Sequence, residues 1–181
     1  MHLPFETRVT IELLLASPQH RYEGRPSDGP MDATARELHD SIEVRAGLGI
    51  VGDRHFGQRA HVTASVTVMA AESVEHVART LGTGPLLAAD TRRNIIVRGL
   101  EIDAMRGETF SIDSGHGPVT LIAHRPANPC AWMDVVLAPG AHRALRQRGG
   151  MRCEPLTSGT LTLGPAIVRR AVASTAPLAL F

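Results

Sequence analysis

The sequence contains no lysine, so all 19 of its basic residues are arginine. An internal Schiff base with pyridoxal phosphate and a Walker-type phosphate site both need a lysine, so these two classes of enzyme are excluded. The net charge of +1 gives no electrostatic case for a nucleic acid or a membrane surface as partner.

Cysteine is also scarce, and the two present, Cys130 and Cys153, do not make a disulfide framework in a chain of 181 residues. A reducing compartment is the default for such a chain. Glu6, Arg8 and Glu12 surround the first apolar run, which therefore resembles neither a signal peptide nor a membrane span. These features predict a cytoplasmic protein, and its 43% hydrophobic and 20% charged residues are typical of one soluble globular domain over residues 1–181.

Short apolar segments bounded by turn residues dominate the chain and predict seven or eight strands, at 8–16, 41–44, 66–69, 95–97, 107–112, 119–123, 151–156 and 160–168. Helical spacing is rarer and predicts a helix over 70–81, a second over 141–147, a helical turn at 32–38 and a short helix after Pro129. The fold class that follows is mostly β with helical decorations (α+β), a twisted and largely antiparallel β-barrel.

Two segments have no regular pattern. Residues 18–31 form a long loop that is either a functional lid or a solvated connection, and they carry His20, Arg21, Tyr22 and Arg25. Residues 169–181 form an apolar tail, for which a last strand, a dimer contact and a frayed end all stay open.

The first candidate site is Cys130, in the stretch from Leu121 to Asp134 that also holds the only tryptophan, Trp132. Pro126 and Pro129 interrupt ladder pairing, and the helical pattern that follows places Cys130 at the entrance of a short helix. Exposed backbone N–H groups and the helix dipole favour a thiolate there, which suits a nucleophile or a ligand for a soft metal. Packing as a small hydrophobic residue is the alternative.

Residues 47–52 match the glycine pattern of a dinucleotide-binding loop, but no amphipathic helix follows them, so a Rossmann fold is rejected. The glycines instead predict tight turns or close backbone approach. Asp53, Arg54 and His55 then lie on a glycine-flanked loop, where an Asp–Arg pair that pins the turn competes with a functional role.

Arg92, Arg93 and Asn94 precede the strand at 95–97. Neighbouring strand residues face opposite ways, so at most one of the two arginines is expected to point into a given pocket. Guanidinium groups suit phosphate or carboxylate oxygens, although a charged, exposed strand edge explains the pair equally well.

Several separated motifs together resemble one family. They are Gly49-Ile50-Val51-Gly52-Asp53-Arg54-His55, Arg93-Asn94-Ile95 with Gly99-Leu100, Gly107 with Phe110, Asn128-Pro129-Cys130, Arg148-Gly149-Gly150, and Gly159 with Leu161 and Gly164. In order and spacing they resemble the MOSC domains (molybdenum cofactor sulfurase C-terminal domain), specifically the small stand-alone members, from about residue 41 to residue 164. The larger relatives attach this domain to a pyridoxal-phosphate desulfurase, which is missing here.

The resemblance implies a MOSC-type β-barrel and a molybdenum cofactor (molybdopterin) whose metal is ligated by Cys130. It also implies that arginines hold the pterin phosphate. The candidates are Arg54, Arg92, Arg93, Arg125 and Arg148, of which Arg93 and Arg54 rank first because they lie inside the matched motifs. Asn94 and Asp53 are expected to hydrogen-bond the pterin ring, whereas Cys153 lies outside the motifs and is expected to pack in a strand.

Three functions remain open at this point. The first is an oxidoreductase that acts on small N-hydroxylated or similar compounds, with electrons from an external donor protein. The second is a sulfur carrier that receives sulfur from a donor protein, bears it as a persulfide on Cys130 and passes it to a metal or a partner in metal-sulfur or cofactor maturation. The third is a non-catalytic cofactor-binding module. The oligomeric state is left open, with a homodimer among the options.

Overall fold

The computed structural model describes residues 5–170, so the predicted tail beyond Arg170 lies outside the described residues. Ten strands are present in this part of the chain. They are β1 (Phe5–Leu14), β2 (Ser41–Arg45), β3 (Gly49–Ile50), β4 (Val66–Ala70), β5 (Ile95–Arg98), β6 (Thr109–Asp113), β7 (Val119–Pro126), β8 (Met151–Pro155), β9 (Gly159–Thr162) and β10 (Gly164–Arg170).

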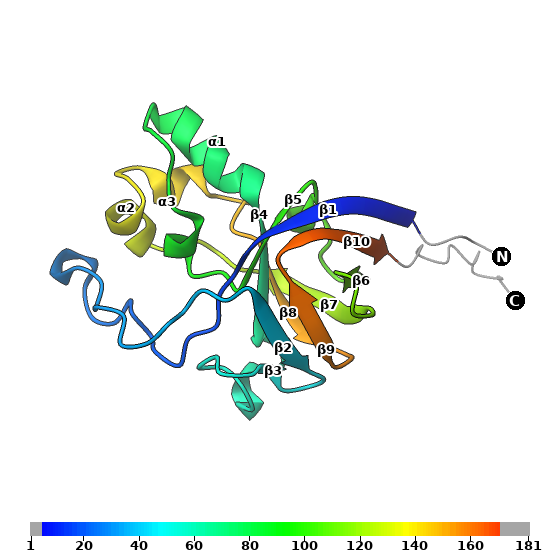
Figure 1. Cartoon of the computed structure of the whole chain (residues 1–181). Helices are drawn as coiled ribbons and strands as arrows, with labels where there is room; N and C mark the ends of the chain where they lie inside the picture. Colours follow the sequence, from blue (N-terminus) through cyan, green and yellow to red (C-terminus); the bar gives the residue numbers. More distant parts are fainter. Residues whose placement is uncertain (1–4, 171–181) are drawn as a thin grey trace, which may run out of the picture.

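Seven of the strands close into a barrel in the order β1-β10-β6-β7-β8-β4-β5 (Figure 1). Its pairs are antiparallel except for β4 and β5, which are parallel because the helix α1 (Ala71–Leu81) connects them. The predicted β-barrel with helical decorations is therefore confirmed, with one parallel pair in it. Apolar side chains from all seven strands fill the interior.

β8 shows how the barrel sorts its side chains. Met151, Cys153 and Pro155 are buried, whereas Arg152 and Glu154 alternate with them on the outer face. Cys153 is 0% exposed, and burial raises the pKa of its thiol to about 12. Its expected role as a strand-packing residue matches this position.

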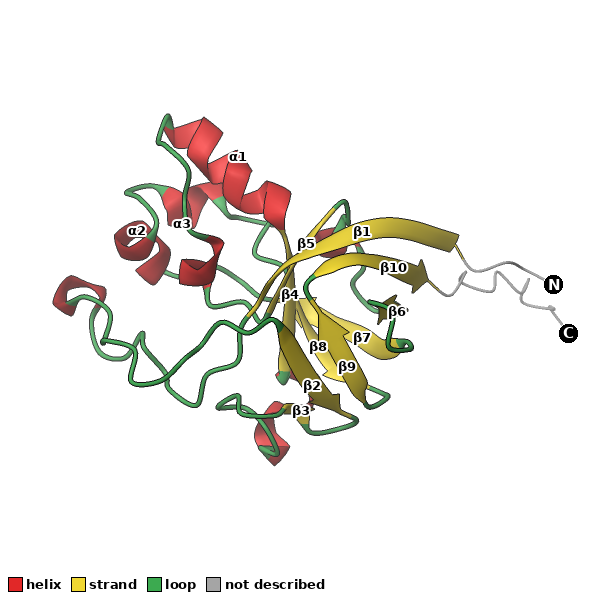
Figure 2. Ribbon diagram, viewed as in Figure 1, coloured by secondary structure: helices red, strands yellow, loops and turns green. Residues whose placement is uncertain are grey.

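The α-helices gather at one end of the barrel, on the left in Figure 2. They are α1, α2 (Trp132–Val136) and α3 (Ala141–Ala144), and they pack on a second apolar cluster that includes Met69, Ile96 and Trp132. α1 ends at Gly82 in the left-handed conformation, as its sequence predicts. Four 3-10 helices complete the described part: η1 (Pro26–Asp28), η2 (Arg59–Ala64), η3 (Ala88–Thr91) and η4 (Ile102–Ala104). Within residues 5–170, no helix combines the length and apolarity that crossing a bilayer requires.

A smaller sheet of order β3-β2-β9 lies beside the barrel. β2 turns into β3 through the glycines that suggested a dinucleotide motif. Gly49 has a φ of 108°, and a Cβ there would lie 2.9 Å from the Cβ of Ser65, so close backbone approach is the reason for glycine at this position.

The helical turn predicted at 32–38 is wrong. Leu38 instead forms an antiparallel bridge with Leu15, and the backbone N–H of Ala16 donates to the Glu37 carbonyl at 3.0 Å. The segment is irregular, with a bend at 34–35, and its end pairs with the chain beyond β1.

Two other boundaries differ from the predictions. The helix expected over 141–147 ends at Ala144, because the chain turns and Gln147 takes a φ of 62°. The single strand expected over 160–168 is two strands, since β9 pairs with β2 whereas β10 enters the barrel. The chain changes sheet at Leu163, whose N–H donates to the Asp40 carbonyl.

Candidate functional site

Cys130 lies on the loop between β7 and α2, with its side chain exposed. Its carbonyl accepts a hydrogen bond from the backbone N–H of Met133 at 2.9 Å, which forms the first turn. The predicted position at the entrance of a short helix is correct, and α2 is only 5 residues long.

A cavity of about 320 Å³ lies beside Cys130, within the usual size range of small-molecule sites. Five separate segments of the chain form its wall. The lining residues are His20, Arg21, Tyr22, Arg54, Thr91, Arg92, Arg93, Asn128, Pro129, Cys130, Trp132, Met133 and Arg152. Among the described residues, the lining includes five arginines and no carboxylate.

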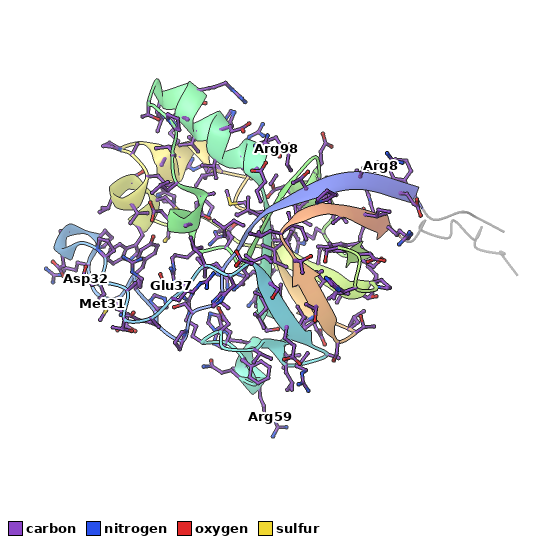
Figure 3. The ribbon with its side chains drawn as sticks, viewed as in Figure 1. Arg8, Met31, Asp32, Glu37, Arg59 and Arg98 are labelled. Carbon is purple, nitrogen blue, oxygen red and sulfur yellow. The ribbon has the colours of Figure 1, made fainter. Side chains whose placement is uncertain are left out.

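Arg92 is neutralised by Glu37, although both side chains are buried. Its two terminal nitrogens each donate to a Glu37 oxygen at 2.7 Å, and Glu37 also accepts hydrogen bonds from Ser17 at 2.6 Å and from Arg21 at 3.3 Å. Burial alone would raise the pKa of Glu37, but the hydrogen bonds from Arg92 and Ser17 outweigh it and lower that pKa to about 2. In Figure 3, Glu37 lies on the barrel side of its segment, whereas Met31 and Asp32 lie on the outer part. This network ties the segment after β1 to the start of β5.

Arg93 holds three loops together through backbone carbonyls. Its guanidinium donates to the carbonyl oxygens of Gly149 at 2.8 Å, Ala127 at 2.7 Å and Thr91 at 3.0 Å. Burial lowers the pKa of Arg93 to about 10. These hydrogen bonds therefore position the loop that carries Cys130.

The expectation that at most one of Arg92 and Arg93 would face a pocket is wrong, because both line the cavity. Arg92 follows η3 with a φ of 58° and is not part of β5, so the alternation of strand side chains does not apply to it.

Asp53 and Asn94 lie next to one another beneath the wall and do not line the cavity. Asn94 donates to Asp53 and to the Leu15 carbonyl, both at 3.0 Å, and its amide oxygen accepts two hydrogen bonds from Thr67. Asp53 also accepts a hydrogen bond from the backbone N–H of His55 at 3.0 Å, and such a bond from a carboxylate stabilises a turn. Their expected contacts to a pterin ring stay a prediction.

Arg54 lies in the wall, and its orientation depends on His55. Its Nε donates to the Nε2 of His55 at 3.1 Å, so the ring carries its proton on Nδ1. Burial first and the charge of Arg54 second lower the pKa of His55 to about 4. His55 is therefore neutral at pH 7 and able to accept this bond.

Arg125 and Arg148 do not line this cavity, although Arg125 is the β7 partner of the lining residue Arg152. Arg125 is exposed near the end of β7, and Arg148 lines a separate cavity together with Asp103 and Arg146. Any role for these two residues in binding the pterin stays a prediction.

Arg152 lines the cavity, although no motif identified it. It lies on the outer face of β8, which alternation with the buried Met151 and Cys153 could have indicated. Which loop covers that face depends on tertiary structure, and the sequence carries no signal for it.

The loop at 18–31 contributes to the site through Tyr22. The Tyr22 ring stacks on Trp132 with centroids 5.1 Å apart and an interplanar angle of 14°. Its hydroxyl donates to the Asp90 carbonyl at 2.6 Å, and burial raises the pKa of Tyr22 to about 12. The first part of this loop therefore packs over the segment that follows Cys130 and does not lie free in solvent.

This arrangement defines a class of protein, a small mixed β-barrel with an exposed thiol beside an arginine-walled cavity. The family model described as MOSC domain matches residues 51–168, and the chain belongs to this family. The matched range includes Arg54, Arg93, Cys130 and Arg152. Within residues 5–170, no three His, Cys, Asp or Glu side chains are grouped so that they could hold a metal ion.

Solved structures share the fold at low identity. The YuaD protein of Bacillus subtilis superimposes with a TM-score of 0.70 and 17% identity, over 94% of this chain and 100% of that one. YiiM from Escherichia coli has a TM-score of 0.58 and 14% identity, over 92% and 70% of the two chains. YiiM from Geobacillus stearothermophilus has the same TM-score and identity, over 89% and 74%. No curated protein sequence matches the chain.

Proposed function

We propose that the chain binds a molybdenum cofactor in the Cys130 cavity, with the Cys130 thiolate as the protein ligand of the metal, and acts as an oxidoreductase on small N-hydroxylated or similar compounds. The observation that carries the proposal is the exposed thiol at a cavity walled by arginines. MOSC domains are associated with this cofactor, which agrees with the family match.

The residues present fit the chemistry of that group. Molybdenum held by a dithiolene is a soft-sulfur environment, for which a cysteine thiolate is a suitable ligand. The cofactor carries a phosphate, and guanidinium groups bind phosphate through paired N–H donors. The cavity wall supplies both the thiol and the guanidinium groups.

When bound, the cofactor supplies a two-electron redox centre, and the protein supplies binding and orientation. Arg93 fixes the Cys130 loop through the Ala127 carbonyl, and the Tyr22–Trp132 stack covers the segment behind it. Arg54, held by His55, directs positive charge into the cavity. Cys130 remains open to solvent, so a small substrate can reach it.

A sulfur carrier is the second candidate, favoured by the same exposure of Cys130. A persulfide needs a reachable thiol and no resident metal. Cys153 is fully buried in the barrel and is therefore unable to resolve such a persulfide without unfolding.

The test is the metal content of native protein from a host that makes the cofactor. About one molybdenum per chain supports the proposal, whereas cyanide-labile sulfur without molybdenum supports the carrier. Reduction of an N-hydroxylated base by an artificial electron donor then distinguishes an enzyme from a cofactor-binding module. Protein with neither molybdenum nor labile sulfur contradicts both candidates.

A further inference from the structure

Arg152 differs from the other arginines of the cavity because its guanidinium contacts no hydrogen-bond acceptor in the described chain. Its backbone pairs with β4 and β7, but within residues 5–170 its side chain makes no hydrogen bond or ion pair at the usual distances. Burial and the neighbouring charge of Arg125 lower the pKa of Arg152. Arg152 in turn contributes to the lowered pKa of Arg93 and of Arg54, so the three guanidinium groups repel one another.

The other guanidinium groups in the wall already have acceptors. Arg92 and Arg21 share Glu37, and Arg93 donates to three carbonyls. Arg54 is held by His55 through Nε and by a long contact of 3.5 Å to the Gln19 carbonyl, which leaves one terminal nitrogen without an acceptor among the described residues. The buried Nε of Arg92 and one terminal nitrogen of Arg21 also lack an acceptor among the described residues. Arg152 is the arginine of the described wall whose guanidinium has no acceptor at all, and Arg54 keeps one free terminal nitrogen.

An excess of partly desolvated cations is costly unless an anion accompanies them. Guanidinium groups match the oxygens of a tetrahedral oxyanion, and a second cation beside the first strengthens that attraction. We propose that Arg152 and Arg54 form an oxyanion-binding subsite in the Cys130 cavity, and that its ligand is a phosphate or a similar tetrahedral oxyanion group. The subsite stands by itself, but the identity of its occupant rests on the proposed function.

Two different molecules carry an oxyanion group of this kind. The oxyanion is either the phosphate of the cofactor or an anionic group of the substrate. In the first case Arg152 contributes to retention of the cofactor, and in the second it selects the substrate.

The test uses the full chain produced without cofactor and measures alkylation of Cys130 by iodoacetate, which is anionic, and by iodoacetamide, which is neutral. At low ionic strength, Arg152→Gln is expected to lower the ratio of the two rates about fivefold, because the wall loses one cation close to the thiol. Arg54→Gln is expected to act in the same direction. Arg148→Gln removes an exposed arginine outside the cavity and is the matched control, with an unchanged ratio expected.

If the ratio of the two alkylation rates is the same in Arg152→Gln as in Arg148→Gln, the proposal is overturned. Inorganic phosphate gives a second readout on the unaltered chain, in which millimolar phosphate is expected to slow the reaction with iodoacetate more than sodium chloride of equal ionic strength does. Equal slowing by the two salts also overturns the proposal, even if the variant fails to fold.

Molybdenum content then distinguishes the two sources. If Arg152→Gln from a cofactor-producing host loses molybdenum as well as the alkylation ratio, the occupant is the phosphate of the cofactor. If it keeps molybdenum and loses the ratio, the occupant is an anionic group of the substrate. A chain that binds no molybdenum at all contradicts the proposed function, while the alkylation ratio still decides the subsite.

Discussion

Cys153 and Cys130 have the same side chain in opposite surroundings. Cys153 lies in the barrel interior among apolar residues, where burial raises its pKa to about 12 and makes it inert. Cys130 lies outside the barrel wall, exposed beside a cavity with five arginines. Packing inside the barrel keeps one thiol from solvent, whereas loops from both halves of the chain leave the other exposed beside the cavity. Three substitutions and one pH titration test this difference between the barrel and the loops, from the largest expected effect to the smallest.

Arg93→Gln should have the largest effect on stability, although Arg93 lies in the cavity wall. The substitution removes three charge-assisted hydrogen bonds to the carbonyls of Gly149, Ala127 and Thr91. We expect the free energy of unfolding to fall by about 4 kcal/mol, measured by urea denaturation. Arg125→Gln is the control, because this arginine is exposed and outside the cavity. Equal stability of the two variants would contradict the positioning role of Arg93.

Glu37→Gln should rank second, because it leaves the Arg92 guanidinium buried without a counter-charge. The expected loss of stability is about 3 kcal/mol. The segment 15–40 should also exchange its amide hydrogens faster, which hydrogen-exchange mass spectrometry can localise. Asp40→Asn is the control, since Asp40 pairs with Arg36 on the surface. A uniform increase in exchange over the barrel would contradict a local role.

Cys153→Ala should destabilise the chain by about 1.5 kcal/mol through a small cavity in the barrel. It should leave both molybdenum content and the alkylation rate of the chain unchanged, because the buried thiol does not react. Thermal unfolding and thiol titration measure the two effects. A slower alkylation of the native variant would show that Cys153 is reachable after all.

Lowering the pH should reduce the free energy of unfolding through the titration of His55. The pKa of His55 is lowered from 6.5 to about 4, so the unfolded chain takes up a proton in this interval and the folded chain does not. Stability is then fully present above pH 6.5 and falls as the pH drops toward 4. The loss is about 1 kcal/mol after allowance for solvent screening of a half-exposed ring. His55→Gln should flatten this part of the stability curve, and an unchanged slope would contradict the assignment. Titration of Glu37 reduces the stability in a lower pH range, as the pH falls from the ordinary pKa of this carboxyl toward about 2.

Much of the barrel was predictable from the sequence, because alternation and β-branched residues report a buried strand directly. β4, α1 with its terminal Gly82, and the pair β6 and β7 lie where their patterns predicted them. The segment at 32–38 was predicted wrongly, since a buried ion pair between Glu37 and Arg92 fixes it and residues that distant leave no local signal.

The site was predictable only in part, for a similar reason. The motif around Cys130 and the short helix after it are local features and were placed correctly. The arginines all look alike in a sequence, and only tertiary structure decides which of them acquire partners. Glu37 neutralises Arg92 and three carbonyls engage Arg93, whereas Arg152 matches no motif and remains free in the described chain.

The central claim is that Cys130 ligates a molybdenum cofactor in this cavity. The most direct test compares molybdenum per chain in Cys130→Ser and Cys153→Ala, both purified from the same cofactor-producing host as the unaltered protein. We expect Cys130→Ser to fold normally and lose the metal, while Cys153→Ala keeps it. Metal retained by Cys130→Ser at the level of the unaltered protein would contradict the account.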